Sequence, residues 1–208
     1  MRILSVLLVA IALAVALQAQ TFQTLLIFDG ANGANPVDTS LVQGTNGELY
    51  GTTLGGGANS SGTVFKINAA GELTTLYSFC SQANCADGSL PYGGLVLGSD
   101  GNFYGTTSQG GSNGISGTVF KITPVGKLTT LHNFSGQDGA GPGAPLIEGT
   151  DGNFYGITQN GGSNNAGTIF KITPAGALTS LYSIQSGDGF YLNGPLAEGT
   201  DGNFYGTT

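Results

Sequence analysis

The sequence has no tryptophan, one histidine, one methionine and only five lysine and arginine residues in 208 positions. Charged residues make up 8% of the chain, and the net charge is −7. Nucleic acid is therefore not an expected partner, because duplex binding needs clustered lysine and arginine to neutralise phosphates. The chain also lacks an HExxH motif and a Cys–His pair. An enzyme is thus not the favoured class.

Long apolar runs are equally scarce, and the one that exists is N-terminal. Residues 1–19 contain Arg2, an apolar run over 3–17 and a small-residue exit at 16–19. This layout is typical of a secretory signal peptide. A retained membrane anchor is the alternative, but the run is shorter than the roughly 20 residues that cross a bilayer. We expect cleavage near Ala19, a secreted or cell-surface protein, and no membrane association afterwards.

Cysteine is limited to Cys80 and Cys85, in the segment FCSQANCADG. In an exported protein this pair is expected to form a local disulfide. Redox chemistry is the alternative, and zinc is disfavoured because two thiolates cannot supply its four ligands. No metal site is expected from the cysteines.

Glycine, in contrast, occupies 38 positions, and hydrophobic residues make up 39% of the chain. Disordered chains combine low hydrophobicity with high charge, so this composition favours a folded protein. A chain rich in glycine and threonine with few lysine and glutamate residues favours short strands and tight turns over helices.

One eight-residue phrase recurs roughly every fifty residues. It reads DGNFYGTT at 100–107 and 201–208, DGNFYGIT at 151–158 and NGELYGTT at 46–53. Around it we divide the chain into a first strand, three complete units and a partial unit: 22–28, 37–79, 93–134, 144–184 and 194–208. Together they make one repeat region, 20–208. The longer first spacing contains the two cysteines, which marks an insertion in a loop.

Each complete unit contains four candidate strands, which in the second unit cover 93–98, 102–108, 117–123 and 127–134. All are rich in β-branched or aromatic residues and are bounded by Gly, Asn, Asp or Pro. In GTVFKIT, Phe120 and Ile122 point to one face and Val119 and Lys121 to the other, so both faces have apolar groups to bury.

These features predict an all-β, propeller-like array of four-stranded antiparallel blades. A β-solenoid is the rival, although its coils are shorter and lack hairpins. About three and a half blades are present, so we expect an open arc that forms part of a larger ring. An initial fourth strand, 22–28, is typical of propellers that close by pairing their two termini.

The pattern Y-G-T-T, G-G, G-T-V-F-K-I-T-P, G-x-L-T-x-L-Y, D-G and P-L-x-x-G resembles the GloVer tandem repeat of exported bacterial proteins. The resemblance covers nearly everything after residue 19. It implies an extracellular, propeller-like array, often followed by a C-terminal sorting signal that is not present here, and it implies no settled activity. Kelch repeats share the Gly-Gly pairs but carry a tryptophan.

In an antiparallel unit the two long connections, second-to-third strand and fourth-to-next-first strand, fall at one end. Binding residues tend to lie on such loops, so this long-loop face is the expected site. Its candidate binding residues are Asp87, Asn113, Asp138, Asn164, Asp188 and Tyr191, with Asp29, Asn165, Tyr92 and Phe190 as further members. Calcium could assist through the carboxylates, although the dense spacing of a calcium loop is missing and no other cofactor is expected. The alternative is that each Asp-Gly pair only shapes a turn.

Three further features have simpler interpretations than catalysis. His132 occupies a position filled by Leu26, Tyr77 and Tyr182 in other copies, which indicates a packing role. Residues 110–114 match G-x-S-x-G, but no helix is expected to follow, so a nucleophile elbow is not supported. Lys66, Lys121 and Lys171 recur at one strand position, where they could bind an anion or lay their stems along the sheet.

The leading hypothesis is a secreted, non-catalytic repeat protein that presents its long-loop face to an extracellular glycan or protein. One alternative is the N-terminal part of a propeller-type lyase or hydrolase whose catalytic residues lie elsewhere. Another is a structural cell-surface spacer.

Overall fold

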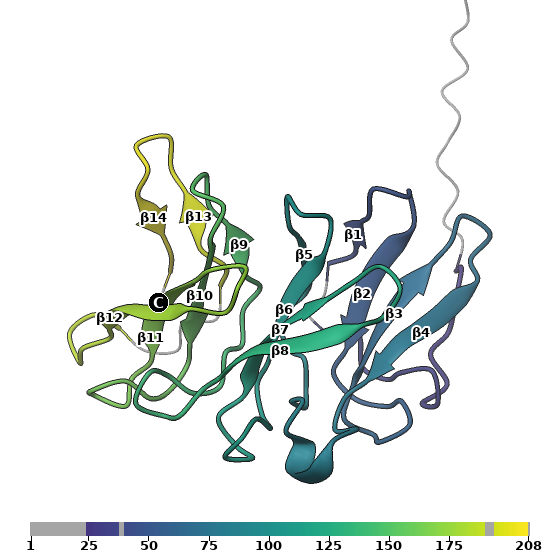
Figure 1. Cartoon of the computed structure of the whole chain (residues 1–208), viewed down its shortest axis with the longest axis horizontal. Helices are drawn as coiled ribbons and strands as arrows, with labels where there is room; N and C mark the ends of the chain where they lie inside the picture. The colour runs from purple at the N-terminus through teal and green to yellow at the C-terminus, as the bar shows by residue number, and fades with distance from the viewer. Residues whose placement is uncertain (1–23, 38–39, 190–193, 208) are drawn as a thin grey trace, which may run out of the picture.

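The computed structural model describes residues 24–37, 40–189 and 194–207 (Figure 1). The predicted signal peptide (1–19) and Tyr191 lie outside the described residues. Within the described ranges the protein is all-β, and its single helical element is the short 3-10 turn η1 (Ala83–Cys85). The predicted fold class is confirmed.

The strands form three four-stranded antiparallel sheets and one two-stranded sheet, and neighbours in each sheet are consecutive in the chain. Each sheet lies within one of the expected units. The first sheet contains β1 (Val42–Gln43), β2 (Leu49–Thr53), β3 (Thr63–Ile67) and β4 (Leu73–Ser78). The second contains β5 (Val96–Leu97), β6 (Phe103–Thr107), β7 (Thr118–Ile122) and β8 (Leu128–Asn133). The third contains β9 (Ile147–Glu148), β10 (Phe154–Thr158), β11 (Thr168–Ile172) and β12 (Leu178–Ser183), and the last β13 (Ala197–Glu198) and β14 (Phe204–Tyr205).

The four sheets fan out one after another from β1–β4 to β13–β14 (Figure 1). The first strands of the first two repeats, β1 and β5, are in contact with each other. The described sheets form an open arc and do not close into a ring. This is the array that the fifty-residue period predicts.

The hydrophobic core lies between the sheets and not inside any one of them. Phe120 and Ile122 of β7 pack with Tyr50 and Phe79 of the preceding repeat. Val119, which precedes Phe120 and points to the opposite face of the sheet, packs in a separate cluster with residues of the following repeat. Burial on both faces of the third strand, expected from its alternation, is therefore confirmed.

The repeated phrase forms the hairpin between the first two strands of each sheet. In the second repeat Gly98 and Asn102 close the turn, and Gly101 takes a φ of +78°. The Asp100 carboxylate accepts hydrogen bonds from the Asn102 backbone N–H and from Tyr104 Oη, at 3.0 and 2.8 Å. Because burial of Tyr104 and its bond to Asp100 both disfavour the phenolate, the pKa of Tyr104 is raised. Asp and Tyr, four residues apart, thus lock the turn to its strand.

One irregularity recurs that the strand pattern does not predict. The pairing of the third and fourth strands shifts register at the same place in each of the three four-stranded sheets, at Val64/Phe65, Val119/Phe120 and Ile169/Phe170. The unpaired residue of the β7–β8 pair is Leu131, which packs against the neighbouring core cluster. Its carbonyl oxygen also lies against the backbone of Gly176, in the β11–β12 turn of the next repeat. The bulge therefore serves the contact between repeats.

Candidate functional site

The long connections gather at one end of the strands. The β4–β5 connection with η1 and the β6–β7 connection lie at the lower edge of Figure 1, whereas the hairpins β1–β2 and β13–β14 lie at its upper edge. Short antiparallel bridges join the connection that enters a repeat to the connection between the second and third strands of that repeat. Ala34 pairs with Gly55, Ser89 with Gln109, and Ala140 with Asn160. Backbone hydrogen bonds thus hold the loops of the long-loop face to one another.

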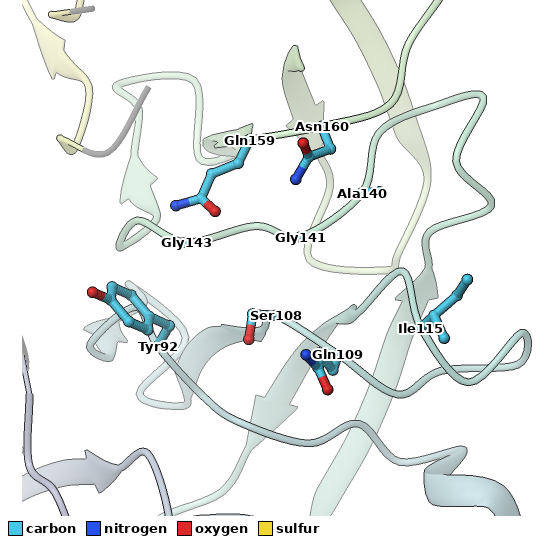
Figure 2. Close-up of a pocket in the computed structure, with 9 residues that line it drawn as sticks. All are labelled: Tyr92, Ser108, Gln109, Ile115, Ala140, Gly141, Gly143, Gln159 and Asn160. Carbon is cyan, nitrogen blue, oxygen red and sulfur yellow. The ribbon is translucent and has the colours of Figure 1, made fainter. Parts of the chain in front are cut away.

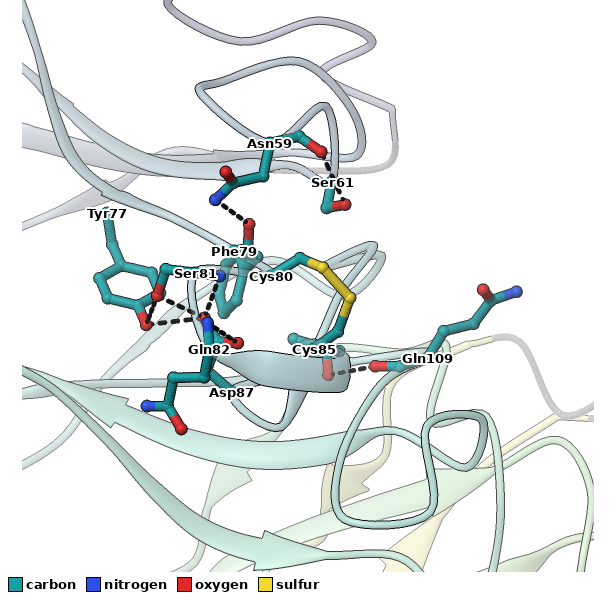
Figure 3. The surroundings of a disulfide bond; sticks show 11 residues. Asn59, Ser61, Tyr77, Phe79, Cys80, Ser81, Gln82, Cys85, Asp87 and Gln109 are labelled. Carbon is teal, nitrogen blue, oxygen red and sulfur yellow. Dashed lines mark hydrogen bonds between the residues drawn. A yellow bond between two sulfur atoms is a disulfide. The ribbon is translucent and has the colours of Figure 1, made fainter.

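Asp87, a predicted binding residue, lies buried beneath this face (Figure 3). Its carboxylate accepts hydrogen bonds from Tyr77 Oη at 2.7 Å, from Ser81 N–H and Oγ at 2.9 Å, and from Gln82 N–H at 3.2 Å. Burial by itself would raise the pKa of Asp87, but these four donors outweigh it and lower the pKa. In the same contact, burial raises the pKa of Tyr77 to about 12.

Asp138 and Asp188 repeat this arrangement in the next two repeats. His132 Nε2 lies 2.8 Å from the Asp138 carboxylate, which also accepts hydrogen bonds from Ser135. Asp188 accepts hydrogen bonds from Tyr182 Oη and from Gln185 N–H, both at 2.8 Å. The strand position shared by Tyr77, His132 and Tyr182 therefore carries the partner of the loop aspartate, and His132 packs edge-on against Phe134.

The segment before the first repeat carries Asn32, and not Asp29, at the position of these aspartates. Asn32 Oδ1 accepts a hydrogen bond from Asp29 N–H at 3.1 Å, as Asp138 does from Ser135 N–H. The glycine that follows each of these aspartates explains why the sequence repeats Asp-Gly at this position. A Cβ at Gly139, where φ is +130°, would lie only 2.6 Å from the Thr158 side chain. The turn-shaping interpretation of Asp-Gly thus has a direct geometric basis.

Asn113 and Asn164 lie exposed in the β6–β7 and β10–β11 loops. Their Nδ2 atoms donate hydrogen bonds to the carbonyl oxygens of Phe134 and Ile184, at 3.2 and 3.0 Å. Each amide thereby fastens its loop to the end of the fourth strand of its own sheet. Of the described candidates, Asp87 belongs to the first repeat, Asn113 and Asp138 to the second, and Asn164 and Asp188 to the third. The side chain of each is held by hydrogen bonds within its own repeat. Among the described residues there is also no group of three potential metal-binding side chains.

The predicted disulfide joins Cys80 and Cys85 (Figure 3). Cys80 N–H donates to Gly88 O, and Cys85 O accepts from Gly111 N–H, both at 3.0 Å. In the next repeat the single residue Gly136 makes both equivalent bonds, to Gly139 and from Gly162. The inserted loop therefore begins and ends where the next repeat has the single residue Gly136, and the disulfide joins the two ends of this loop.

A hollow of about 400 Å³ lies on this face between the second and third repeats (Figure 2). Ala140, Gly141 and Gly143 form its low backbone floor, and in Figure 2 this segment passes between two rows of side chains. Gln159 and Asn160 lie on one side, and Ser108 and Gln109 on the other.

Tyr92 and Ile115 lie at opposite ends of the hollow (Figure 2). Ile115 is 75% exposed. Among the described residues, the lining contains no Asp, Glu, Lys, Arg or His. The hollow therefore offers amide and hydroxyl groups along its sides and an apolar group at each end.

Most of the chain matches one family of repeat proteins. The model of the Gloeobacter/Verrucomicrobia repeat covers residues 12–208. The chain belongs to the Gloeobacter/Verrucomicrobia repeat family. No curated protein matches it.

Two solved structures are similar to this chain in fold. Virginiamycin B lyase from Staphylococcus aureus superposes with a TM-score of 0.52 at 19% identity, over 79% of this chain and 46% of the lyase. A putative gluconolactonase superposes with a TM-score of 0.51 at 15% identity, over 80% of this chain and 55% of the other. The chain thus spans about half the length of these proteins, and the likeness concerns the fold alone.

In this member of the Gloeobacter/Verrucomicrobia repeat family, the residues lining the hollow were not selected by sequence reasoning, apart from Tyr92. The sequence does contain a signal for these residues, which is the variation between repeats at one otherwise equivalent position. Directly after the second strand, the first repeat has Leu54-Gly55, the second Ser108-Gln109 and the third Gln159-Asn160. Positions that break an otherwise regular repeat carry differences that the scaffold does not require. No helix within the described residues is long and apolar enough to span a membrane.

Proposed function

We propose that this chain is a secreted, non-catalytic repeat protein whose long-loop face binds an extracellular glycan. The observation that carries the proposal is the polar hollow on this face, built on loops that are joined to one another by backbone bridges. Its volume falls within the roughly 300–1,000 Å³ of small-ligand sites. Amide and hydroxyl groups on a rigid scaffold suit a hydroxyl-rich ligand.

The secreted location rests on the N-terminal segment 1–19 and on the disulfide, because disulfides persist in oxidising compartments. The non-catalytic role rests on the lining of the hollow, whose groups are amides, hydroxyls, glycine and alanine, and the apolar side chain of Ile115. General acid–base catalysis relies on positioned carboxylates, imidazoles or amines.

The test compares the two ends of the strands. Gln137→Cys places a thiol on the long-loop face, and Val125→Cys places one in the β7–β8 turn at the other end, where Val125 is 87% exposed. Both variants are coupled to a polyethylene glycol maleimide and applied to an array of neutral and acidic oligosaccharides. We expect unmodified protein and the Val125 conjugate to bind and the Gln137 conjugate to lose binding. Equal binding by both conjugates, or no glycan bound by the unmodified protein, contradicts the proposal.

A second candidate is an enzyme of which this chain forms one part. The similar structures are those of a lyase and a putative lactonase, and the chain spans about half of each. This candidate predicts turnover by a longer protein containing these repeats and no glycan binding by the repeats alone. A structural spacer predicts neither binding nor turnover.

A further inference from the structure

We propose that the hollow between the second and third repeats binds one neutral saccharide unit, an inference that rests on the proposed function and assigns it a position and a ligand class. The ligand is uncharged and rich in hydroxyl groups. It lies across the Ala140–Gly143 floor, between the amides of Gln109 and Asn160.

The first argument is the chemistry of the walls. An amide side chain offers both donors and an acceptor, and a sugar hydroxyl is also both donor and acceptor. Within the described part of the chain, no hydrogen bond engages the side-chain amides of Gln109 and Asn160, and both residues are exposed. Their backbones, in contrast, are fixed by the bridges to Ser89 and Ala140. The backbones of Gln109 and Asn160 are thus held in place, while their side-chain amides remain available to hydrogen-bond a ligand.

The second argument is charge. A carboxylated or sulfated saccharide needs a cation, preferably arginine, to replace its hydration. None of the described lining residues is a lysine or arginine, and the whole chain carries a net charge of −7. Such a field repels anions at low ionic strength. A neutral sugar has no such requirement.

The third argument is shape. The floor contains glycine at two positions where a side chain would fill the space, and a Cβ at Gly143 would overlap the Gln159 amide. In the preceding repeat the position of Gly143 is occupied by Tyr92, which instead forms one end of the hollow. The half-exposed ring of Tyr92 and the side chain of Ile115 are suited to the apolar C–H faces of a sugar.

The same comparison distinguishes this junction from the preceding one. Leu54-Gly55 of the first repeat stands where the second and third repeats have Ser108-Gln109 and Gln159-Asn160. The junction between the first and second repeats therefore lacks an amide side chain on one of its sides, and we expect no equivalent saccharide site there.

The experiment uses the full chain and isothermal titration calorimetry. The probes are cellohexaose, xylohexaose, mannohexaose and maltohexaose as neutral oligosaccharides and hexagalacturonate as the acidic one. We expect at least one neutral probe to bind with a stoichiometry near one and with an affinity that does not change with salt. The double variant Gln109→Ala/Asn160→Ala should weaken this binding about tenfold or more, because each lost hydrogen bond costs a few-fold.

The matched control is Gln137→Ala, an exposed amide on the same face that does not line the hollow. It should bind like the wild type. Ile115→Ala, at one end of the hollow, should weaken binding several-fold while leaving the unfolding temperature unchanged, because Ile115 is largely exposed.

Three outcomes overturn the inference, and they differ in what they leave standing. Neutral binding that is unchanged in the double variant refutes the hollow but not the glycan-binding face. Binding of hexagalacturonate alone refutes the neutral ligand class only. No binding of any probe, by protein shown to be folded, refutes both this inference and the proposed function.

Discussion

Tyr104 of the second repeat stacks on Phe154 of the third, with ring centroids 3.9 Å apart and planes 25° from parallel. The same contact joins Tyr50 to Phe103, at 4.1 Å, and Tyr155 to Phe204, at 3.9 Å. Consecutive residues of a strand point to opposite faces, so in N-F-Y-G the phenylalanine faces the previous repeat and the tyrosine the next. The repeated phrase therefore contains both halves of the contact between sheets.

This contact predicts a large effect of truncation. Tyr104→Ala removes a fully buried ring and should lower the free energy of unfolding by about 3–5 kcal/mol. Tyr104→Phe keeps the stack and loses only the bond to Asp100, so it should cost about 1 kcal/mol. Urea denaturation monitored by circular dichroism measures both.

The control for this prediction is Tyr205→Ala. Tyr205 is the equivalent residue of the last described sheet, and its side chain is 56% exposed. We expect a loss below about 1 kcal/mol, because most of the ring remains in water in the wild type. Similar losses at Tyr104 and Tyr205 would show that the stack between sheets is not what stabilises the array.

The glycine of N-F-Y-G predicts a second asymmetry. Gly105 pairs with Phe120 across the sheet, and a Cβ at Gly105 would lie 2.6 Å from Phe120 Cζ. Gly105→Ala should therefore cost about 1–3 kcal/mol through displacement of the ring. Gly187→Ala, at a position where nothing lies within 4 Å of a Cβ, should be neutral or slightly stabilising. Thermal unfolding of the two variants compares them directly, and an equal loss at both positions counts against this packing role.

The loop aspartates predict a loss of stability in acid. Hydrogen bonds hold the pKa of Asp87 and of Asp138 below the ordinary value of 3.8, against the opposing effect of burial. Their stabilisation is complete above the unfolded-state pKa, and it is lost as pH falls below about 4 through the lower folded-state pKa. Unfolding free energies measured from neutral pH downwards should decline in that window.

Two substitutions separate the contributions to this pH dependence. Asp87→Asn should cost about 1–3 kcal/mol at neutral pH, since the amide cannot satisfy the same donors, and should flatten the acid dependence. Asp188→Asn, at the equivalent but exposed position, should have a smaller effect on both. An acid profile that is unchanged in Asp87→Asn would place the titrating group elsewhere.

Reduction of the disulfide predicts a modest and local change. The bond between Cys80 and Cys85 closes a very short loop, so its loss should lower the unfolding free energy by at most about 2 kcal/mol. Far-UV circular dichroism should be retained, and amide hydrogen exchange should rise around η1. Global unfolding on reduction, or in Cys80→Ser/Cys85→Ser, would contradict this account.

Much of the fold could be predicted because its information is local and recurs along the chain. The strand around Phe120 was identified from its alternation, and the hairpin around Gly101 from its turn residues. The strand pattern does not predict the register shift at Leu131, and the contact of Leu131 O with the turn at Gly176 joins two different sheets, which residue spacing within one strand does not show. The Asp-Gly pairs are recognisable in the sequence, but Asp29 is not equivalent to the other loop aspartates. Asn32 follows Leu26 by six residues, as Asp138 follows His132, and its hydrogen bond from Asp29 N–H confirms the equivalence.

The sequence by itself determined the period, the strand order within a repeat and the side of each strand that is apolar. These follow from residue spacing, because side-chain direction alternates along any extended chain. Tertiary structure alone decided that Asp87 is buried beneath its loop while Gln109 and Asn160 surround an open hollow. All three are polar loop residues, but they differ in burial. Asp87 is covered because its loop folds back against Tyr77 of β4, whereas Gln109 and Asn160 face the solvent between two repeats.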